Sequence, residues 1–175
     1  MKKYILLSFS ILFAVLVSCK KDTAVATSGT ITLSSQQFVS GASYASYGLS
    51  FVAGALQKYP GQAVDVLVLA LKPTGTITAV FFTAPDYYTG NFNNTDYNPD
   101  ITAAETLFNN YSEVTATNFQ PVTDTLKVGQ IITYKSGANK FAKILIRNIN
   151  IVTTDPPYAK VTISWDYQPN GTSKF

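Results

Sequence analysis

The stretch from Tyr158 to Tyr167, YAKVTISWDY, alternates between apolar and polar side chains at every position after Tyr158. Successive side chains of a β-strand point to opposite faces of a sheet, so this pattern buries one face and leaves the other in water. Such half-buried strands are typical of antiparallel sheets. The segment therefore predicts a strand whose core side is formed by Ala159, Val161, Ile163, Trp165 and Tyr167.

Two further segments predict strands with different surroundings. The apolar residues of Phe141–Val152 change parity along the segment, which indicates a bulge or bend near Arg147 and Asn148. Val64–Leu71 is apolar on both parities apart from Asp65, as expected of a central strand that is covered on both faces. Shorter strands bring the expected total to about seven. These are Thr76–Thr83, Leu126–Lys135, Gly48–Ala53 and Thr30–Leu33.

One segment has helical rather than strand periodicity. In Thr102–Tyr111, apolar residues recur at helical spacing, and Thr102 and Glu105 have the spacing of a capping box at the helix start. We therefore expect a mainly β fold with a minor α+β character. It would be a single β-rich domain over residues 29–175, built as an antiparallel sandwich or a bent sheet with one short helix.

The N-terminal residues have the features of an export signal. Lys2 and Lys3 precede a short apolar run, and that run ends in Leu16-Val17-Ser18-Cys19. This ending resembles the lipobox of bacterial lipoproteins, in which the cysteine receives a lipid and becomes the first residue of the mature chain. The alternative is an ordinary secretory signal with an incidental free cysteine near the cut.

The lipobox resemblance implies a division of the chain into three parts. Residues 1–18 would be a lipoprotein signal peptide, 19–28 the lipidated Cys19 with a polar tether, and 29–175 the domain. Acyl chains contribute roughly 0.8 kcal/mol per buried methylene, so covalent lipid on Cys19 would anchor the protein to the outer membrane. No other cofactor is expected. The sequence leaves open whether the domain faces the cell surface or the periplasm.

Composition excludes most catalytic chemistry. The chain has no histidine, and its one cysteine is assigned to the anchor, so it cannot form a Ser-His-Asp triad, a Cys-His pair or a His- or Cys-ligated zinc site. We expect no enzyme and no metal site. Without Lys2 and Lys3, the thirteen basic residues become eleven against ten acidic ones, a net charge of +1. Nucleic acid is therefore not an expected partner.

The last third of the chain is similar to a known family. Gly129–Tyr134, Lys140–Ile144 and Trp165–Thr172, with the terminal Phe175, resemble the end of HmuY-like lipoproteins of the Bacteroidota over roughly residues 125–175. The resemblance implies a lipid-anchored, β-rich shell. The first members described in that family bind haem through two histidines, which this chain lacks. Because tyrosine also ligates haem iron, haem stays among the candidate ligands.

One long stretch without periodicity is the candidate binding site. Pro85–Asp100, PDYYTGNFNNTDYNPD, is expected to be a loop, and loops of this length are often functional. Aromatic rings beside amide groups suit a sugar or another flat ligand. Alternatively, the tyrosines fold back over the core. The candidate ligand-binding residues are Tyr87, Tyr88, Phe92, Asn94 and Tyr97.

The leading hypothesis is a lipid-anchored, non-catalytic binding or interaction module of the cell envelope. A glycan, haem or another envelope protein is the expected partner. One alternative is a carboxylate-dependent glycan hydrolase that uses Asp86, Asp96 and Asp100, and another is a purely structural envelope protein. Tyr44 and Tyr47, which precede an expected strand, either line the rim of a site or flank a turn.

Overall fold

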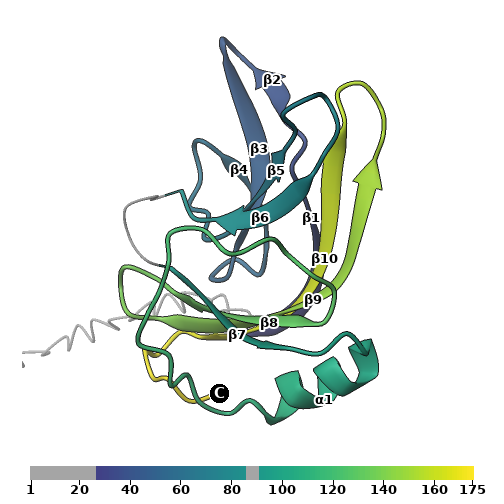
Figure 1. The fold of residues 1–175 in the computed structure, drawn as a ribbon. Coiled ribbons are helices and arrows are strands. Elements are labelled where there is room, and N and C mark those ends of the chain that lie inside the picture. The colour runs from purple at the N-terminus through teal and green to yellow at the C-terminus, as the bar shows by residue number, and fades with distance from the viewer. Residues whose placement is uncertain (1–26, 86–90) are drawn as a thin grey trace, which may run out of the picture.

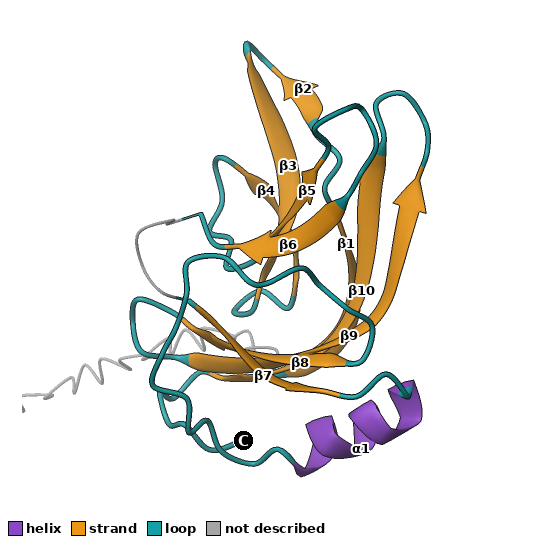
Figure 2. Cartoon of the chain, in the orientation of Figure 1, coloured by secondary structure: helices purple, strands orange, loops and turns teal. Residues whose placement is uncertain are grey.

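A computed structural model of the chain describes residues 27–85 and 91–175. These residues form ten strands and one α-helix, so the predicted mainly β fold is confirmed (Figure 2). The largest sheet has five antiparallel strands, in the order β1-β10-β9-β8-β7. They are β1 (Ser28–Ser34), β7 (Phe92–Tyr97), β8 (Gln130–Lys135), β9 (Phe141–Val152) and β10 (Tyr158–Gln168).

Two smaller antiparallel sheets complete the domain. One has the order β2-β3-β4, and the other pairs β5 with β6. Figure 1 shows β9 and β10 curving up beside these sheets, whereas the helix α1 (Ile101–Asn110) lies below the five-stranded sheet on its opposite side. The bent main sheet therefore holds a core on each face. The smaller sheets contain β2 (Phe38–Ser40), β3 (Ser43–Ser50), β4 (Ala55–Tyr59), β5 (Leu67–Leu71) and β6 (Ala79–Thr83).

The bulge predicted in β9 is present. Thr162 of β10 is paired with Asn148, and the next residue, Ile163, is paired with Ile146, so Arg147 is the extra residue. Before the bulge, Ile144 and Ile146 are fully buried in the main core. An extra residue in a strand moves the side chain of every later residue to the opposite face of the sheet. Because of this change, apolar residues on both sides of the bend in β9 contact the core.

The alternation of β10 is also confirmed, because its five predicted core residues are all buried. Trp165 and Tyr167 pack against Phe51, with ring centroids 5.6 and 5.5 Å apart. Tyr134 of β8 contacts the same ring at 5.2 Å. Offset and edge-on aromatic pairs of this kind stabilise a core beyond the area they bury. Phe51, at the turn after β3, therefore joins the small sheets to the large one.

The prediction that Val64–Leu71 is a central strand covered on both faces is wrong. The strand β5 starts only at Leu67 and pairs with β6 alone, and Leu69 and Leu71 are 38% and 53% exposed. Val66 still pairs with Leu49 of β3, but the two strands then diverge. The apolar run therefore ends as the edge strand of a two-stranded sheet. Apolar composition alone does not distinguish such an edge from a central strand.

Asp65, the exception in that run, has two specific partners. Its carboxylate accepts hydrogen bonds from the backbone amide of Phe51 at 2.8 Å and from the hydroxyl of Tyr134 at 3.1 Å. Burial, opposed by these two bonds, raises the pKa of Asp65 above its ordinary value. Burial also raises the pKa of Tyr134. Asp65 is therefore a polar link between the small sheets and β8.

The strand count and several boundaries also differ from expectation. The structure has ten strands where about seven were expected, because β2, β4 and β7 lack apolar alternation. The segment expected from Gly48 to Ala53 is instead the end of β3 and the turn that follows it. Short strands with one exposed edge bury few side chains, so their sequences show little pattern.

The helix is present, but its cap is not the one predicted. Asp100 is the N-cap, and its carboxylate accepts from the amides of Thr102 and Ala103 at 2.8 and 3.1 Å. Glu105 forms an ion pair with Arg147 of the β9 bulge instead of closing a capping box. Asp is as strong an N-cap residue as Ser or Thr. None of the helices among the described residues is long and apolar enough to cross a membrane.

Candidate functional site

The segment predicted as a binding loop is largely a strand. Residues 92–97 form β7, which pairs with β8 at the edge of the main sheet, so the expectation of a loop over Pro85–Asp100 is wrong for its second half. Asn, Thr and Asp occupy most of this strand and conceal its pairing from a periodicity argument. Two of the candidate residues, Tyr87 and Tyr88, lie outside the described residues, as do Asp86 and the proposed anchor, Cys19.

Phe92 is a core residue. It is 1% exposed, and its ring packs against Phe82 and Tyr134 with centroid distances of 6.4 and 5.5 Å. A ring enclosed in this way presents no face to a ligand. For this position, the alternative in which the aromatic side chains fold back over the core is the correct one.

The two remaining candidates, Asn94 and Tyr97, line one pocket. A bulge at Thr95 separates them, since Asn94 is paired with Ile132 and Asp96 with the adjacent Ile131. Bulges at sheet edges re-aim side chains. The pocket, here called the β7 pocket, has a volume of about 280 Å³. It is lined by Asn94, Thr95, Asp96, Tyr97, Asp124, Thr125, Lys127 and Gln130.

A chain of hydrogen bonds fixes the polar floor of the β7 pocket. Gln130, 7% exposed, donates to the side-chain oxygen of Asn94 at 2.8 Å, and Asn94 donates to Asp124 at 2.8 Å. The side-chain oxygen of Gln130 also accepts from the backbone amide of Lys127 at 3.0 Å. These hydrogen bonds therefore fix which way the side-chain amides of Gln130 and Asn94 are oriented. The network holds one oxygen of Asp124, while its second oxygen has no hydrogen-bond partner among the described residues.

Tyr97 forms the aromatic wall. Tyr97 is 49% exposed, and the ammonium nitrogen of Lys127 lies 5.5 Å from the centroid of its ring. A cation near an aromatic face at this distance is attracted by the ring quadrupole, which limits the motion of both side chains. The pocket therefore combines an open aromatic surface with a positive group and two carboxylates, those of Asp96 and Asp124.

The opposite wall is held by the segment 118–126. The backbone of Gln120 pairs with that of Phe92 in β7, and the side chain of Asn93 donates to the carbonyl of Asn118 at 2.8 Å. Farther along, Thr123 and Leu126 donate to backbone carbonyls of β6. The segment thus bridges the main sheet and the β5-β6 sheet, and it fixes Asp124 opposite β7.

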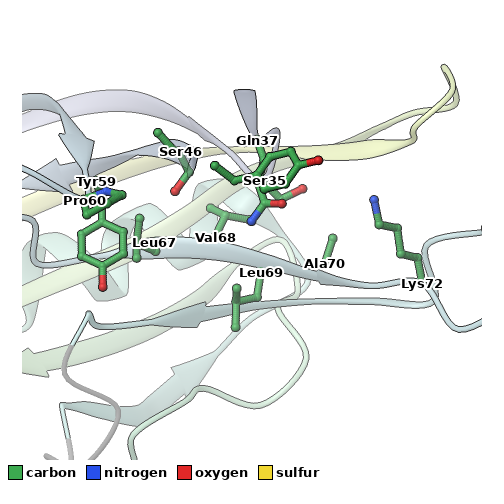
Figure 3. Close-up of a pocket in the computed structure, with 12 residues that line it drawn as sticks. Ser35, Gln37, Ser46, Tyr59, Pro60, Leu67, Val68, Leu69, Ala70 and Lys72 are labelled. Carbon is green, nitrogen blue, oxygen red and sulfur yellow. The ribbon is translucent and has the colours of Figure 1, made fainter. Parts of the chain in front are cut away.

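A second hollow, the β5 cleft, lies where β3 and β5 diverge (Figure 3). Its volume is about 230 Å³, and Figure 3 shows Tyr59 and Pro60 at one end and Lys72 at the other. Tyr44 lines this cleft with 71% of its surface exposed, in agreement with the rim alternative. Tyr47 instead stacks on Phe38 of β2, at 5.0 Å between centroids. The divergence of β3 and β5 is enough to explain why this cleft exists, so its presence does not by itself indicate a ligand site.

Two carboxylates of the hydrolase hypothesis, Asp96 and Asp100, belong to the described residues and have separate surroundings. Asp100 caps α1, and Asp96 lies in the β7 pocket with one oxygen accepting from the amide of Tyr97 at 2.7 Å. Asp100 is therefore occupied by the helix terminus rather than directed at a reacting group. Among residues 27–85 and 91–175, no three acidic, histidine or cysteine side chains gather into a cation site.

Sequence reasoning missed Asp124, Lys127 and Gln130, which complete the β7 pocket. They lie about thirty residues beyond β7 and enter the pocket only because segment 118–126 and β8 pack against that strand. No local motif marks them. The one available signal is the polar side chain of Gln130 in a strand whose other early residues are apolar.

No protein-family model, curated protein or solved structure matches this chain. The resemblance of residues 125–175 to HmuY-like lipoproteins stays a prediction, and this segment contains β8, β9 and β10 at the centre of the main sheet. Neither hollow contains a histidine. The tyrosines that line them are Tyr97 in the β7 pocket and Tyr44 and Tyr59 in the β5 cleft.

Proposed function

We propose that this protein is a lipid-anchored lipoprotein of the outer membrane that acts as a non-catalytic binding module, with the β7 pocket as its ligand site. The observation that carries the proposal is the hydrogen-bonded chain from Gln130 through Asn94 to Asp124 beside the half-exposed ring of Tyr97. Pre-oriented polar groups next to an exposed aromatic surface are the usual elements of a small-molecule site.

The non-catalytic part of the proposal follows from the roles of the polar groups. In the pocket, the side chains of Gln130, Asn94 and Asp124 hold one another, and the histidine that serves as the base of Ser-His-Asp and Cys-His mechanisms is missing from the sequence. Rigid acceptors and donors of this kind favour recognition of a ligand over proton transfer to it.

The anchor is proposed from the lipobox resemblance at Cys19. The strand β1 begins at Ser28, nine residues after Cys19. A fully extended chain of that length spans about 30 Å, so the domain would stay close to the membrane. In cells supplied with labelled palmitate, we expect the protein to carry the label and to sediment with membranes, and Cys19→Ala to lose both properties. An unlabelled wild-type protein in the soluble fraction would remove the anchor from the account.

The binding function is tested by thermal denaturation against a panel of sugars, amino acids, short peptides and haem. A ligand at 100 times its Kd stabilises the folded protein by about 2.7 kcal/mol, which is readily detected. We expect at least one class to raise the melting temperature of the wild type and not that of Tyr97→Ala. If no class does so, the purely structural alternative gains support, whereas a shift that persists in the variant would place the ligand site outside the β7 pocket. Release of products from a glycan would instead favour the hydrolase alternative.

A further inference from the structure

Building on the proposed function, we infer that the β7 pocket binds a single neutral sugar ring, such as the terminal residue of a glycan. The inference rests on three properties of the pocket: its size, the arrangement of its hydrogen-bonding groups and its charge.

The size of the pocket suits one ring. Its volume of about 280 Å³ is just below the roughly 300–1,000 Å³ typical of sites for drug-sized molecules. It opens at the edge of the main sheet, beyond the last strand, β7. A sugar ring can therefore enter while the rest of a glycan continues into solvent.

The polar groups match a set of adjacent hydroxyls. A sugar hydroxyl both donates and accepts, and the pocket offers acceptors on Asp96 and Asp124 together with donors on Lys127 and Thr125. Asp124 is held by Asn94 through one oxygen only, so the other remains available to a ligand hydroxyl. Because the network fixes the carboxylate of Asp124 beforehand, little conformational entropy is lost in ordering this acceptor on binding.

The aromatic wall accommodates the apolar part of the same ligand. The C–H groups on one side of a sugar ring form an apolar surface, and the half-exposed ring of Tyr97 provides a flat apolar partner. A ligand that is apolar on one face and polar at its rim fits a pocket with this division.

The charge of the pocket selects against acidic sugars. Two carboxylates and one ammonium group give it a net charge of −1, by a count of Asp96, Asp124 and Lys127. A ligand carboxylate would approach more negative than positive charge in this pocket, which is unfavourable. Neutral hexoses avoid this repulsion.

The test is calorimetric titration of the mature chain, from Cys19 to Phe175, in a detergent without a sugar headgroup. The probes are the methyl glycosides of glucose, galactose, mannose and N-acetylglucosamine, with methyl glucuronide as the acidic comparison. We expect at least one neutral glycoside to bind more tightly than the glucuronide. Tyr97→Ala should weaken that binding tenfold or more, whereas Tyr44→Ala, at the β5 cleft, should leave it unchanged.

Asp124→Asn tests the charge argument separately. An amide at this position keeps an oxygen for the hydrogen bond from Asn94 but removes one negative charge. We expect it to narrow the preference for neutral over acidic glycoside. Melting curves of every variant report whether the fold is retained, and the three altered side chains, of Tyr44, Tyr97 and Asp124, all belong to exposed residues.

Three results would overturn the inference: no binding of any neutral glycoside, equal binding to wild type and Tyr97→Ala, or tighter binding of the glucuronide. Failure of the sugar inference is distinguishable from failure of the proposed function. If a peptide or amino acid stabilises the wild type but not Tyr97→Ala, the pocket remains a binding site and only the ligand class is wrong.

Discussion

The ammonium nitrogen of Lys143, on β9, lies 2.9 Å from the carbonyl oxygen of Phe108 in the last turn of α1. It also donates to the carbonyl of Tyr111 at 2.9 Å and forms an ion pair with Asp166 at 3.2 Å. The last carbonyls of a helix have no intrahelical partner and carry a partial negative charge. A buried lysine on the sheet, 4% exposed in its side chain, therefore closes the C-terminal end of the helix.

Lys143→Met should destabilise the fold. The substitution leaves two helix carbonyls and the carboxylate of Asp166 without their cation, although Asp166 is 34% exposed in its side chain and water partly replaces the lost partner. We expect a loss of about 2 to 3 kcal/mol in the free energy of unfolding, measured in urea. Lys160→Met, on the exposed side of β10, is the matched control and should change stability by less than about 0.5 kcal/mol. Equal effects of the two substitutions would contradict the capping role.

Asp65 should make stability depend on pH. Its pKa is raised from 3.8 in the folded protein, so between 3.8 and the raised value the folded state holds a proton that the unfolded state has lost. The contribution of Asp65 to stability therefore falls as pH rises through this window and is constant above it.

Asp65→Asn removes that titration. An amide in this position accepts from the amide of Phe51 and donates to the oxygen of Tyr134. Urea unfolding at intervals from pH 3 to pH 7 should show the variant gaining stability relative to wild type as pH rises. A difference between the two proteins that stays constant across this range would show that Asp65 is not perturbed.

Phe92 and Tyr97 should separate stability from binding. Phe92→Ala empties a fully enclosed core position, and we expect it to cost about 3 to 5 kcal/mol in the free energy of unfolding. Tyr97→Ala loses an exposed ring and its contact with Lys127, at a cost below about 1 kcal/mol. Denaturation curves of both variants check this, and a large loss from Tyr97→Ala would assign that ring to the fold.

The helix cap gives a smaller, local prediction. Asp100→Ala removes the acceptor for two amides at the start of α1 and should cost about 1 kcal/mol. Thr102→Ala should cost less, because the amide of Thr102 donates to Asp100 and its own side chain is not the cap. The reverse order of the two effects in urea unfolding would restore the capping box predicted from Thr102 and Glu105.

The predictable parts of the fold are the elements in which burial of one face produces a periodic pattern of apolar residues in the sequence. The alternation of β10 and the change of parity at Arg147 both record which face of a long, paired strand is buried. β5 was misassigned because a run of apolar residues has the same appearance at a sheet edge as at its centre. β7 was missed because it is the last strand of the main sheet and several of its side chains are exposed, so polar residues are tolerated there.

The candidate site was predictable only in part. Aromatic and amide residues clustered in sequence identified Asn94 and Tyr97, which do line one pocket, but the same reasoning included Phe92, which is core. The rest of the pocket comes from segment 124–130, brought to β7 by strand pairing and by the bridging segment. Contacts between residues so far apart in sequence follow from the topology of the sheet and leave no local signal.

The central claim, that the β7 pocket binds a neutral sugar ring, is tested most directly by nuclear magnetic resonance. The side-chain amide groups of Asn94 and Gln130 lie in its floor and give resonances of their own. During titration of the mature protein with the neutral glycosides, these two signals should move in a saturable manner, and the backbone signals of the β5 cleft should stay in place. Movement confined to the β5 cleft, or no movement at saturating glycoside, would contradict the account.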